Sequence, residues 1–230
     1  MSQKTKKILV LVALFILPAF FFYLLVYTGK HKVNRLHFYG PKEIVQVEKR
    51  GSIIYDTTYH SIPFFQAQTL DNIPFTAKTL EGKIYLAHFL DMANLKDIPK
   101  EITYIASEIL PTYPSLLFVS YLENTTNDLN LQAPSERTKK LDGTDNRWSY
   151  VKVDSTTAQY LKLEGYFKPS PTDTVEYDPA SIVLVDMEGR IRGYYNPAFS
   201  SDISNLKKEI SLLYKEYELA FKTHKYIEFN

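Results

Sequence analysis

The chain has 230 residues, and its 27 basic and 26 acidic side chains leave a formal net charge of +1, which gives no reason to expect a nucleic-acid partner. It contains no cysteine, so disulfides, thiolate zinc sites, iron–sulfur clusters and thiol nucleophiles are excluded. Hydrophobic residues make up 45% of the sequence, which is enough for the core of one sizeable domain.

The first segment of the chain is strongly apolar. Residues 8–27 carry no charge over 20 positions, and as a helix they would be about 30 Å long, the thickness of the hydrocarbon core of a bilayer. Fifteen of them are Leu, Ile, Phe or Val, and at about −0.3 to −0.6 kcal/mol each their insertion gains roughly 5 to 9 kcal/mol. A cleaved signal peptide would end in small residues, whereas this segment ends in bulky ones up to Tyr27. The sequence therefore predicts an uncleaved anchor over residues 1–28, in contact with lipid through residues 8–27.

The anchor is followed by a predicted connector and then by the main domain. Residues 29–51 contain Gly40 and Pro41, which mark a turn, and we assign them to the connector. The domain then runs over residues 52–230. It begins with a short strand at residues 52–55 and a hairpin within residues 62–79.

The centre of the domain is the stretch of residues 82–102. Residues 84–89 form a short apolar run typical of a strand that is buried on both faces. A polar loop follows at residues 91–97, and after Pro99 an amphipathic helix carries an apolar residue every three or four positions. Many α/β domains place their functional groups in such a loop, at the carboxyl end of a central strand.

The remaining elements continue the alternation of strands and helices. Strands are predicted at residues 116–121, 149–153, 181–186 and 190–195, and helices at residues 155–165 and 203–223. Ser155 is the expected N-cap of the first of these helices, and residues 187–189 form a hairpin turn. This order predicts an α/β fold of the thioredoxin type, with one N-terminal transmembrane helix before it.

Several segments together resemble the Sco/SenC family, thioredoxin-like copper proteins that are anchored in membranes and assist the assembly of cytochrome c oxidase. Segments similar to the family are RLHFYGPKEI, YHSIPFF, LEGKIYLAHF and SIVLVDMEGRIRGYY, between Arg35 and Tyr195, together with the last helix. The resemblance extends to about Phe221, and it depends on the order and spacing of the segments. Lysines on both sides of the anchor give only a slight charge bias, so the charges do not decide the orientation. The orientation is taken from the resemblance, which implies a single-pass protein of a bacterial inner membrane with its domain facing the periplasm.

The residues at the family's copper-binding positions differ from the family pattern. The family binds copper through two cysteines of a Cys-Pro-x-x-Cys-Pro loop and a later histidine. In this sequence the resemblance places Asn94 and Ile98 at the cysteines, Leu95 at the first proline, and Asp178 near the histidine; only Pro99 matches. Cu(I) prefers thiolate, thioether or imidazole ligands, and Ile98 has no donor atom. We therefore expect no copper site and no cofactor.

Two other constellations near the same loop have simpler explanations. His88 and Met92 could replace the missing ligands, but His88 lies inside the predicted buried strand, where a packed and hydrogen-bonded histidine is expected. Asp91 and Asp97 could bind a hard cation or act as a general base, but acidic residues are also favoured before a helix N-terminus. Trp148, the single tryptophan, is expected to anchor the core.

The sequence thus favours a binding or assembly module for a membrane complex, such as a respiratory oxidase, over an enzyme. The predicted binding rim is formed by Met92, Asn94, Leu95, Asp178 and Pro179. Two alternatives remain open. One is a metal carrier or enzyme that uses Asp91, Asn94, Asp97 and Asp178, and the other is a structural accessory subunit of a membrane complex.

Overall fold

A computed structural model describes residues 3–28, 35–49, 51–91, 100–123, 147–171, 178 and 181–228. The chain divides into two compact units, Met1–Asn34 and Arg35–Asn230, which are treated separately below. The second unit contains both hydrophobic cores and all strands that the structure describes.

The first unit consists of one helix, α1 (Gln3–Thr28), with Pro18 in its interior. Within the described ranges, no helix combines the length and the apolar character needed to cross a membrane. The transmembrane helix predicted at residues 8–27 is therefore not supported by the structure.

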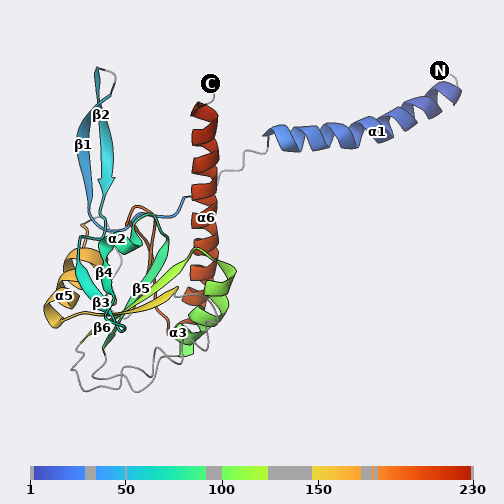
Figure 1. The fold of residues 1–230 in the computed structure, drawn as a ribbon. Helices are drawn as coiled ribbons and strands as arrows, with labels where there is room; N and C mark the ends of the chain where they lie inside the picture. Colours follow the sequence, from blue (N-terminus) through green and yellow to red (C-terminus); the bar gives the residue numbers. More distant parts are fainter. Residues whose placement is uncertain are drawn as a thin grey trace. The chain divides into compact units, whose positions relative to one another are not determined.

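Figure 1 shows the second unit built around a sheet that includes β3, β4, β5 and β6. The sheet has seven strands in the order β4-β3-β7-β6-β5-β8-β9. Strands β5, β6 and β7 run parallel to one another, and β3, β8 and β9 join as antiparallel neighbours. The strands are β3 (Gln66–Thr69), β4 (Pro74–Thr76), β5 (Tyr85–Asp91), β6 (Leu117–Glu123), β7 (Trp148–Lys152), β8 (Ile182–Val185) and β9 (Ile191–Tyr195). This arrangement confirms the predicted mixed α/β fold.

Helices cover both faces of the sheet. They are α2 (Ala77–Leu80), α3 (Lys100–Tyr104), which continues as a π-helical turn (Ile105–Ile109) and a 3-10 turn (Leu110–Thr112), α5 (Ser155–Tyr160), which continues as a π-helical turn (Leu161–Tyr166), and α6 (Ser200–Glu228). Because side chains alternate along β5, Leu86 packs into a core with α3 and α6, whereas Tyr85 and Ala87 pack into a second core with α5. The continuous apolar run of β5 thus reflects burial on both faces.

The structure departs from the predicted elements at two positions. Asp154, not Ser155, caps α5, because its carboxylate accepts a hydrogen bond from the backbone N–H of Thr157 at 2.8 Å. Residues 29–51, which were predicted to be a connector, contain the strand β1 (Lys42–Lys49).

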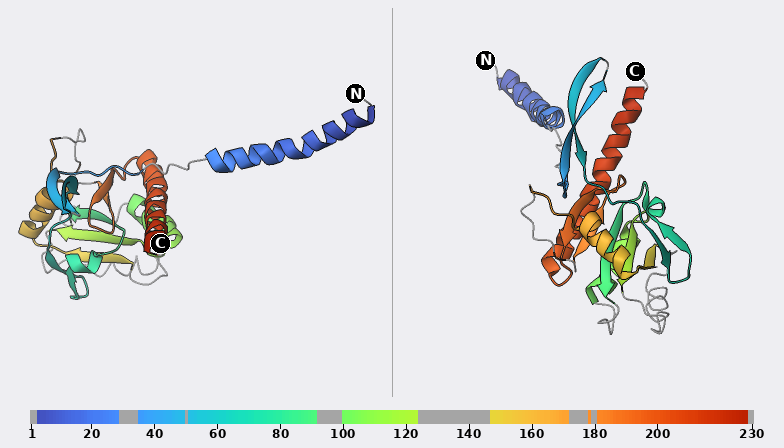
Figure 2. Two further views of the ribbon diagram at one scale, coloured as in Figure 1. Left: turned by 90° about the horizontal axis from the view of Figure 1, so that it is seen from above. Right: turned by 90° about the vertical axis from the view of Figure 1, so that its left-hand side faces the viewer.

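Strand β1 pairs with β2 (Ser52–Tyr59) in a separate two-stranded sheet. This hairpin and the C-terminal part of α6 project from the same side of the domain (Figures 1 and 2). All residues of β2 from Ser52 to Thr58 are exposed to solvent. Both elements therefore extend beyond the compact core.

Candidate functional site

The functional edge predicted from the sequence is the carboxyl end of the parallel strands. Asp91, the last residue of β5, pairs in register with Glu123, the last residue of β6, so the two strands end side by side. The loop that was expected to carry chemistry follows Asp91. The structure therefore places the start of this loop at the edge where an open α/β sheet binds its ligands.

Glu123 is paired with a cation at this edge. Lys162, from the π-helical turn after α5, forms an ion pair with the Glu123 carboxylate, and both side chains are largely shielded from water. The Lys162 ammonium also lies 5.1 Å from the centroid of the Phe89 ring, a cation–π distance. The carboxylate and the aromatic ring together hold Lys162 over the end of β5.

Asp178 approaches the same edge from another element. Strand β8 runs antiparallel to β5 with Val183 opposite Ala87, so the chain that leads into β8 comes from the carboxyl side of β5. The exposed Asp178 carboxylate accepts a hydrogen bond from the Asn196 side-chain amide at 3.0 Å, and its carbonyl accepts one from the Ser181 N–H at 2.8 Å. Asp178 therefore has a structural role at the start of β8.

The other predicted rim residues lie outside the described residues. They are Met92, Asn94, Leu95 and Pro179. Their contribution to a binding surface stays a prediction. Asp97, named in the alternative of a metal carrier or enzyme, and Ile98, at a family cysteine position, also lie outside the described residues.

His88 is a buried core residue. Its Nδ1 lies 3.2 Å from the Ser120 hydroxyl, which also accepts a hydrogen bond from the Trp148 indole N–H at 2.8 Å. The imidazole stacks on the Phe118 ring at 5.1 Å, and burial lowers the pKa of His88 to about 3. These contacts confirm the packed, hydrogen-bonded role predicted for His88, and the buried Trp148 belongs to the same core, as expected.

The side chains that the sequence offers at the expected ligand positions do not fit a copper ion. The positions expected for ligands hold an amide, an aliphatic chain and a carboxylate, whereas Cu(I) requires soft donors. The imidazole of His88, on β5 itself, is buried in the core, and its Nδ1 contacts the Ser120 hydroxyl of β6. In the part of the chain that the structure describes, no three His, Asp or Glu side chains cluster in a way that could hold a metal ion.

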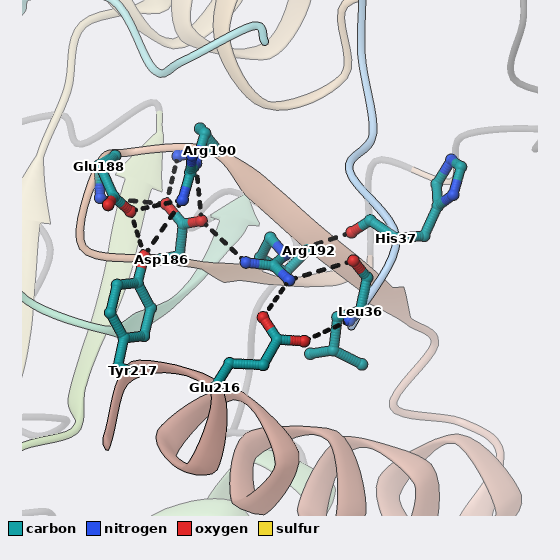
Figure 3. Close-up of polar contacts among 8 residues, drawn as sticks. All are labelled: Leu36, His37, Asp186, Glu188, Arg190, Arg192, Glu216 and Tyr217. Atoms are coloured by element: carbon teal, nitrogen blue, oxygen red, sulfur yellow. Dashed lines mark hydrogen bonds and ion pairs between the residues drawn. The ribbon is translucent and has the colours of Figure 1, made fainter. Parts of the chain in front are cut away.

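The structure also shows a buried ion network that the sequence analysis missed. Asp186, at the end of β8, and Arg192, in β9, are almost completely buried, and Arg192 Nη1 lies 3.1 Å from Asp186 Oδ2 (Figure 3). The Glu216 carboxylate of α6 accepts a hydrogen bond from Arg192 Nη2 at 2.6 Å. Arg190 Nε donates to the same Asp186 oxygen at 2.9 Å. The only sign of this network in the sequence is that Arg190 and Arg192 are two positions apart in a predicted strand, which places both side chains on the same face.

This network also binds the backbone of Leu36 and His37, in the segment that precedes the β1–β2 hairpin. Arg192 donates hydrogen bonds to the backbone carbonyls of Leu36 and His37, at 3.1 and 3.3 Å, and the Leu36 N–H donates to the Glu216 carboxylate at 2.5 Å (Figure 3). The guanidinium groups of Arg190 and Arg192 lie 4.8 and 4.1 Å from the centroid of the Phe38 ring. The network therefore fixes the chain just before the β1–β2 hairpin.

A pocket of about 270 Å³ lies near the base of the hairpin. Its lining includes Ser61, Phe64, Leu80, Tyr85 and Met187. Since Tyr85 is the first residue of β5, this pocket lies at the amino end of the strand, away from the predicted rim. The two sites are therefore separate.

Comparison with known proteins finds similar proteins only among solved structures. No protein-family model matches the chain, and no curated protein matches it. A SCO1/SenC family lipoprotein from Bacillus anthracis str. Ames is similar at a TM-score of 0.50 and 18% identity, over 66% of this chain and 94% of that one. BsSco, a member of the Sco family of cytochrome c oxidase assembly proteins, gives 0.49 and 17%, over 65% and 92%. The thioredoxin domain of a thiol-disulfide oxidoreductase from Bacteroides vulgatus gives 0.46 and 16%, over 66% and 95%.

The likeness to the lipoprotein, at this identity, is a likeness of fold. It agrees with the strand order and with the resemblance inferred from the sequence. The chain has a thioredoxin-like fold of the kind found in Sco/SenC proteins, built from a sequence without cysteine.

Proposed function

We propose that this chain is a binding or assembly module for a membrane complex, such as a respiratory oxidase, and that it works without copper or thiol chemistry. The observation that carries the proposal is a thioredoxin-like sheet with a complete core in a chain of 230 residues that has no cysteine. Thiol–disulfide exchange requires a thiolate, so the redox chemistry of thioredoxin-like oxidoreductases cannot occur here. Binding is the function that this scaffold can still perform.

The class of partner follows from the resemblance of the sequence to the Sco/SenC family, which assists the assembly of cytochrome c oxidase. The proposed contact surface is the rim of Met92, Asn94, Leu95, Asp178 and Pro179 at the carboxyl end of β5. An apolar anchor such as Leu95 within polar surroundings is the usual composition of the centre of an interface.

Membrane attachment is part of the proposal and rests on the sequence. Residues 8–27 carry no charge, and the gain from their insertion would be roughly 5 to 9 kcal/mol. The described part of the structure does not support a membrane-spanning helix, so sequence and structure disagree on this point. We favour the sequence here, because twenty consecutive uncharged and mostly apolar residues have the length and composition of a membrane-spanning helix. The domain would then face the periplasm of a bacterial inner membrane.

The proposal is tested in a strain of the source organism that lacks this chain. Oxidase activity and the amount of assembled oxidase in isolated membranes should fall, and the wild-type chain should restore both. The Leu95→Asp variant, produced at the same level, should restore neither. Leu163→Asp, which places the same charge at an exposed leucine of the π-helical turn after α5, should restore both. Full oxidase assembly in the strain without the chain would contradict the proposed function.

A further inference from the structure

The β1–β2 hairpin is an isolated sheet with exposed apolar side chains on both faces. Ile44 is 75% exposed, Ile53 67% and Tyr55 71%, and Val47 and Ile54 are exposed on the opposite face. Among the residues that the structure describes, each strand of this sheet pairs only with the other. A two-stranded hairpin is marginally stable in water, and three or more strands with an apolar face are needed for independent stability. The hairpin therefore has the properties of an incomplete sheet.

The outer edge of β1 lacks most of the features that prevent edge pairing. Its eight residues are in continuous register with β2, without a bulge, and none of them is a proline. The four residues from Ile44 to Val47 carry no charge. Charged residues occur only at the two ends of β1, and such residues usually protect an edge by repelling a second strand.

The charges of β1 form a nearly palindromic pattern, KEIVQVEK. When two copies of one strand pair antiparallel, residues that lie opposite each other must point to the same face of the sheet. A two-fold axis meets this condition only when it passes midway between a residue of one copy and the identical residue of the other. With the axis at Val45, Lys42 of one copy lies opposite Glu48 of the other, and this contact occurs twice. Glu43 then lies opposite Val47, so seven residues pair without a like-charge contact.

We infer that β1 is the interface between two copies of this chain, which pair antiparallel about Val45 into a continuous four-stranded sheet. A second copy is favoured as the occupant because the charges of β1 are complementary to those of β1 itself. Within the hairpin, Lys42 lies opposite Tyr59 and Glu48 opposite Ile53. These cross-strand neighbours are uncharged, so the two charges are available for pairing across the two-fold axis. The inference does not depend on the proposed function.

The first test is the oligomeric state of the full chain in detergent, measured by sedimentation velocity. The wild type should form dimers. Glu48→Lys and Lys42→Glu should each weaken the dimer about tenfold or more, because each single change creates two like-charge contacts. The double variant Lys42→Glu/Glu48→Lys exchanges the two charges and should restore the wild-type dimer. A monomeric wild type, or a dimer that neither single change weakens, would show that the partner is another protein, a lipid surface or a different face, and would overturn the inference.

The second test uses the absence of native cysteine, which leaves no background in a crosslinking experiment. Directly opposite residues of an antiparallel pair have Cα atoms about 4.5–5.5 Å apart, within the range that a disulfide can bridge. Val45→Cys should therefore form a disulfide-linked dimer under mild oxidation. A mixture of the Ile44→Cys and Gln46→Cys chains should form the mixed dimer more than either chain dimerises alone. The matched control is Tyr55→Cys on β2, and crosslinking there at the rate of Val45→Cys would overturn the assignment to β1.

Discussion

Arg192 Nη1 donates a hydrogen bond to Asp186 Oδ2 at 3.1 Å, and both side chains are shielded from water almost completely. A buried charge is tolerated only when it is paired and its remaining hydrogen-bonding groups are satisfied. Here the second branch of Arg192 binds Glu216 and the Leu36 carbonyl, and the second oxygen of Asp186 accepts the backbone N–H groups of Glu188 and Arg190. The pair therefore connects β8, β9 and α6 to the segment before β1.

The first prediction concerns this network. Arg192→Met should lower the free energy of unfolding by about 3–5 kcal/mol, because it leaves the Asp186 carboxylate buried with fewer partners. The control, Arg190→Met, removes a guanidinium that is 25% exposed but leaves Asp186 paired with Arg192, so it should cost less, about 2 kcal/mol. Urea denaturation followed by the fluorescence of the single tryptophan, Trp148, measures both. Equal losses in the two variants would contradict a central role for Arg192.

The second prediction concerns pH. Burial lowers the pKa of His88 from 6.5 to about 3, so between these pH values the unfolded chain binds a proton at His88 that the folded chain does not. The contribution of His88 to stability is therefore complete above pH 6.5 and decreases as the pH falls toward 3. The wild type should lose stability faster than His88→Asn, by about 1 kcal/mol per pH unit below 6.5. Urea midpoints of the two proteins across this range provide the measurement, and parallel curves would refute the assignment.

The third prediction concerns the rim. Leu95→Asp should leave the melting temperature unchanged, because a charge in a surface loop is usually tolerated, and should weaken crosslinking to a partner in the membrane complex. Leu163→Asp is the control with an exposed leucine elsewhere. A melting temperature lowered by the equivalent of a few kcal/mol would mean that Leu95 is packed in the core. An unchanged melt with unchanged crosslinks would mean that the rim is not the interface.

The fourth prediction concerns metal. The purified protein, loaded with Cu(I) and then treated with a strong Cu(I) chelator, should retain no stoichiometric copper by metal analysis. The reason is the donor set, since the positions expected for ligands hold Asn94, Ile98 and Asp178. Retained copper would instead assign ligand roles to His88 and Met92. The same preparation should show no thiol–disulfide reductase activity.

The fifth prediction concerns topology. If residues 8–27 span the inner membrane with the domain in the periplasm, alkaline phosphatase fused after Asn230 should be active, because the enzyme folds only outside the cytoplasm. A fusion after Lys7 is the cytoplasmic control and should be inactive. Release of the whole chain from membranes by alkaline carbonate would contradict the anchor.

Much of the fold followed from local patterns in the sequence. The apolar run at residues 84–89 predicted β5, because a strand that is buried on both faces carries apolar side chains on both of them. The hairpin predicted within residues 62–79 is β3–β4, and the turn predicted at residues 187–189 joins β8 to β9, because turn residues act over a few positions. Ser155 was predicted as a cap one residue too late, since Asp154 is an equally good acceptor and only the backbone geometry distinguishes them.

The candidate site was accessible to sequence reasoning only in part. The sequence by itself determined which chemistry is impossible, because excluding thiol and Cu(I) sites requires only the identity of the side chains. It also identified His88 as a packed residue from its place in an apolar run.

The tertiary structure alone decided where the charged residues lie. Arg190 and Arg192 follow a hairpin turn and have the pattern of a solvent-exposed strand face, yet Arg192 is buried against Glu216 and against Leu36, which lies 156 residues earlier in the chain. In the same way, residues 52–55 were predicted as a strand of the main domain, yet they belong to β2, whose residues Ser52 to Thr58 are exposed on the hairpin. Burial of a charge and exposure of an apolar side chain both depend on partners that are distant in the sequence, and no local pattern contains that information.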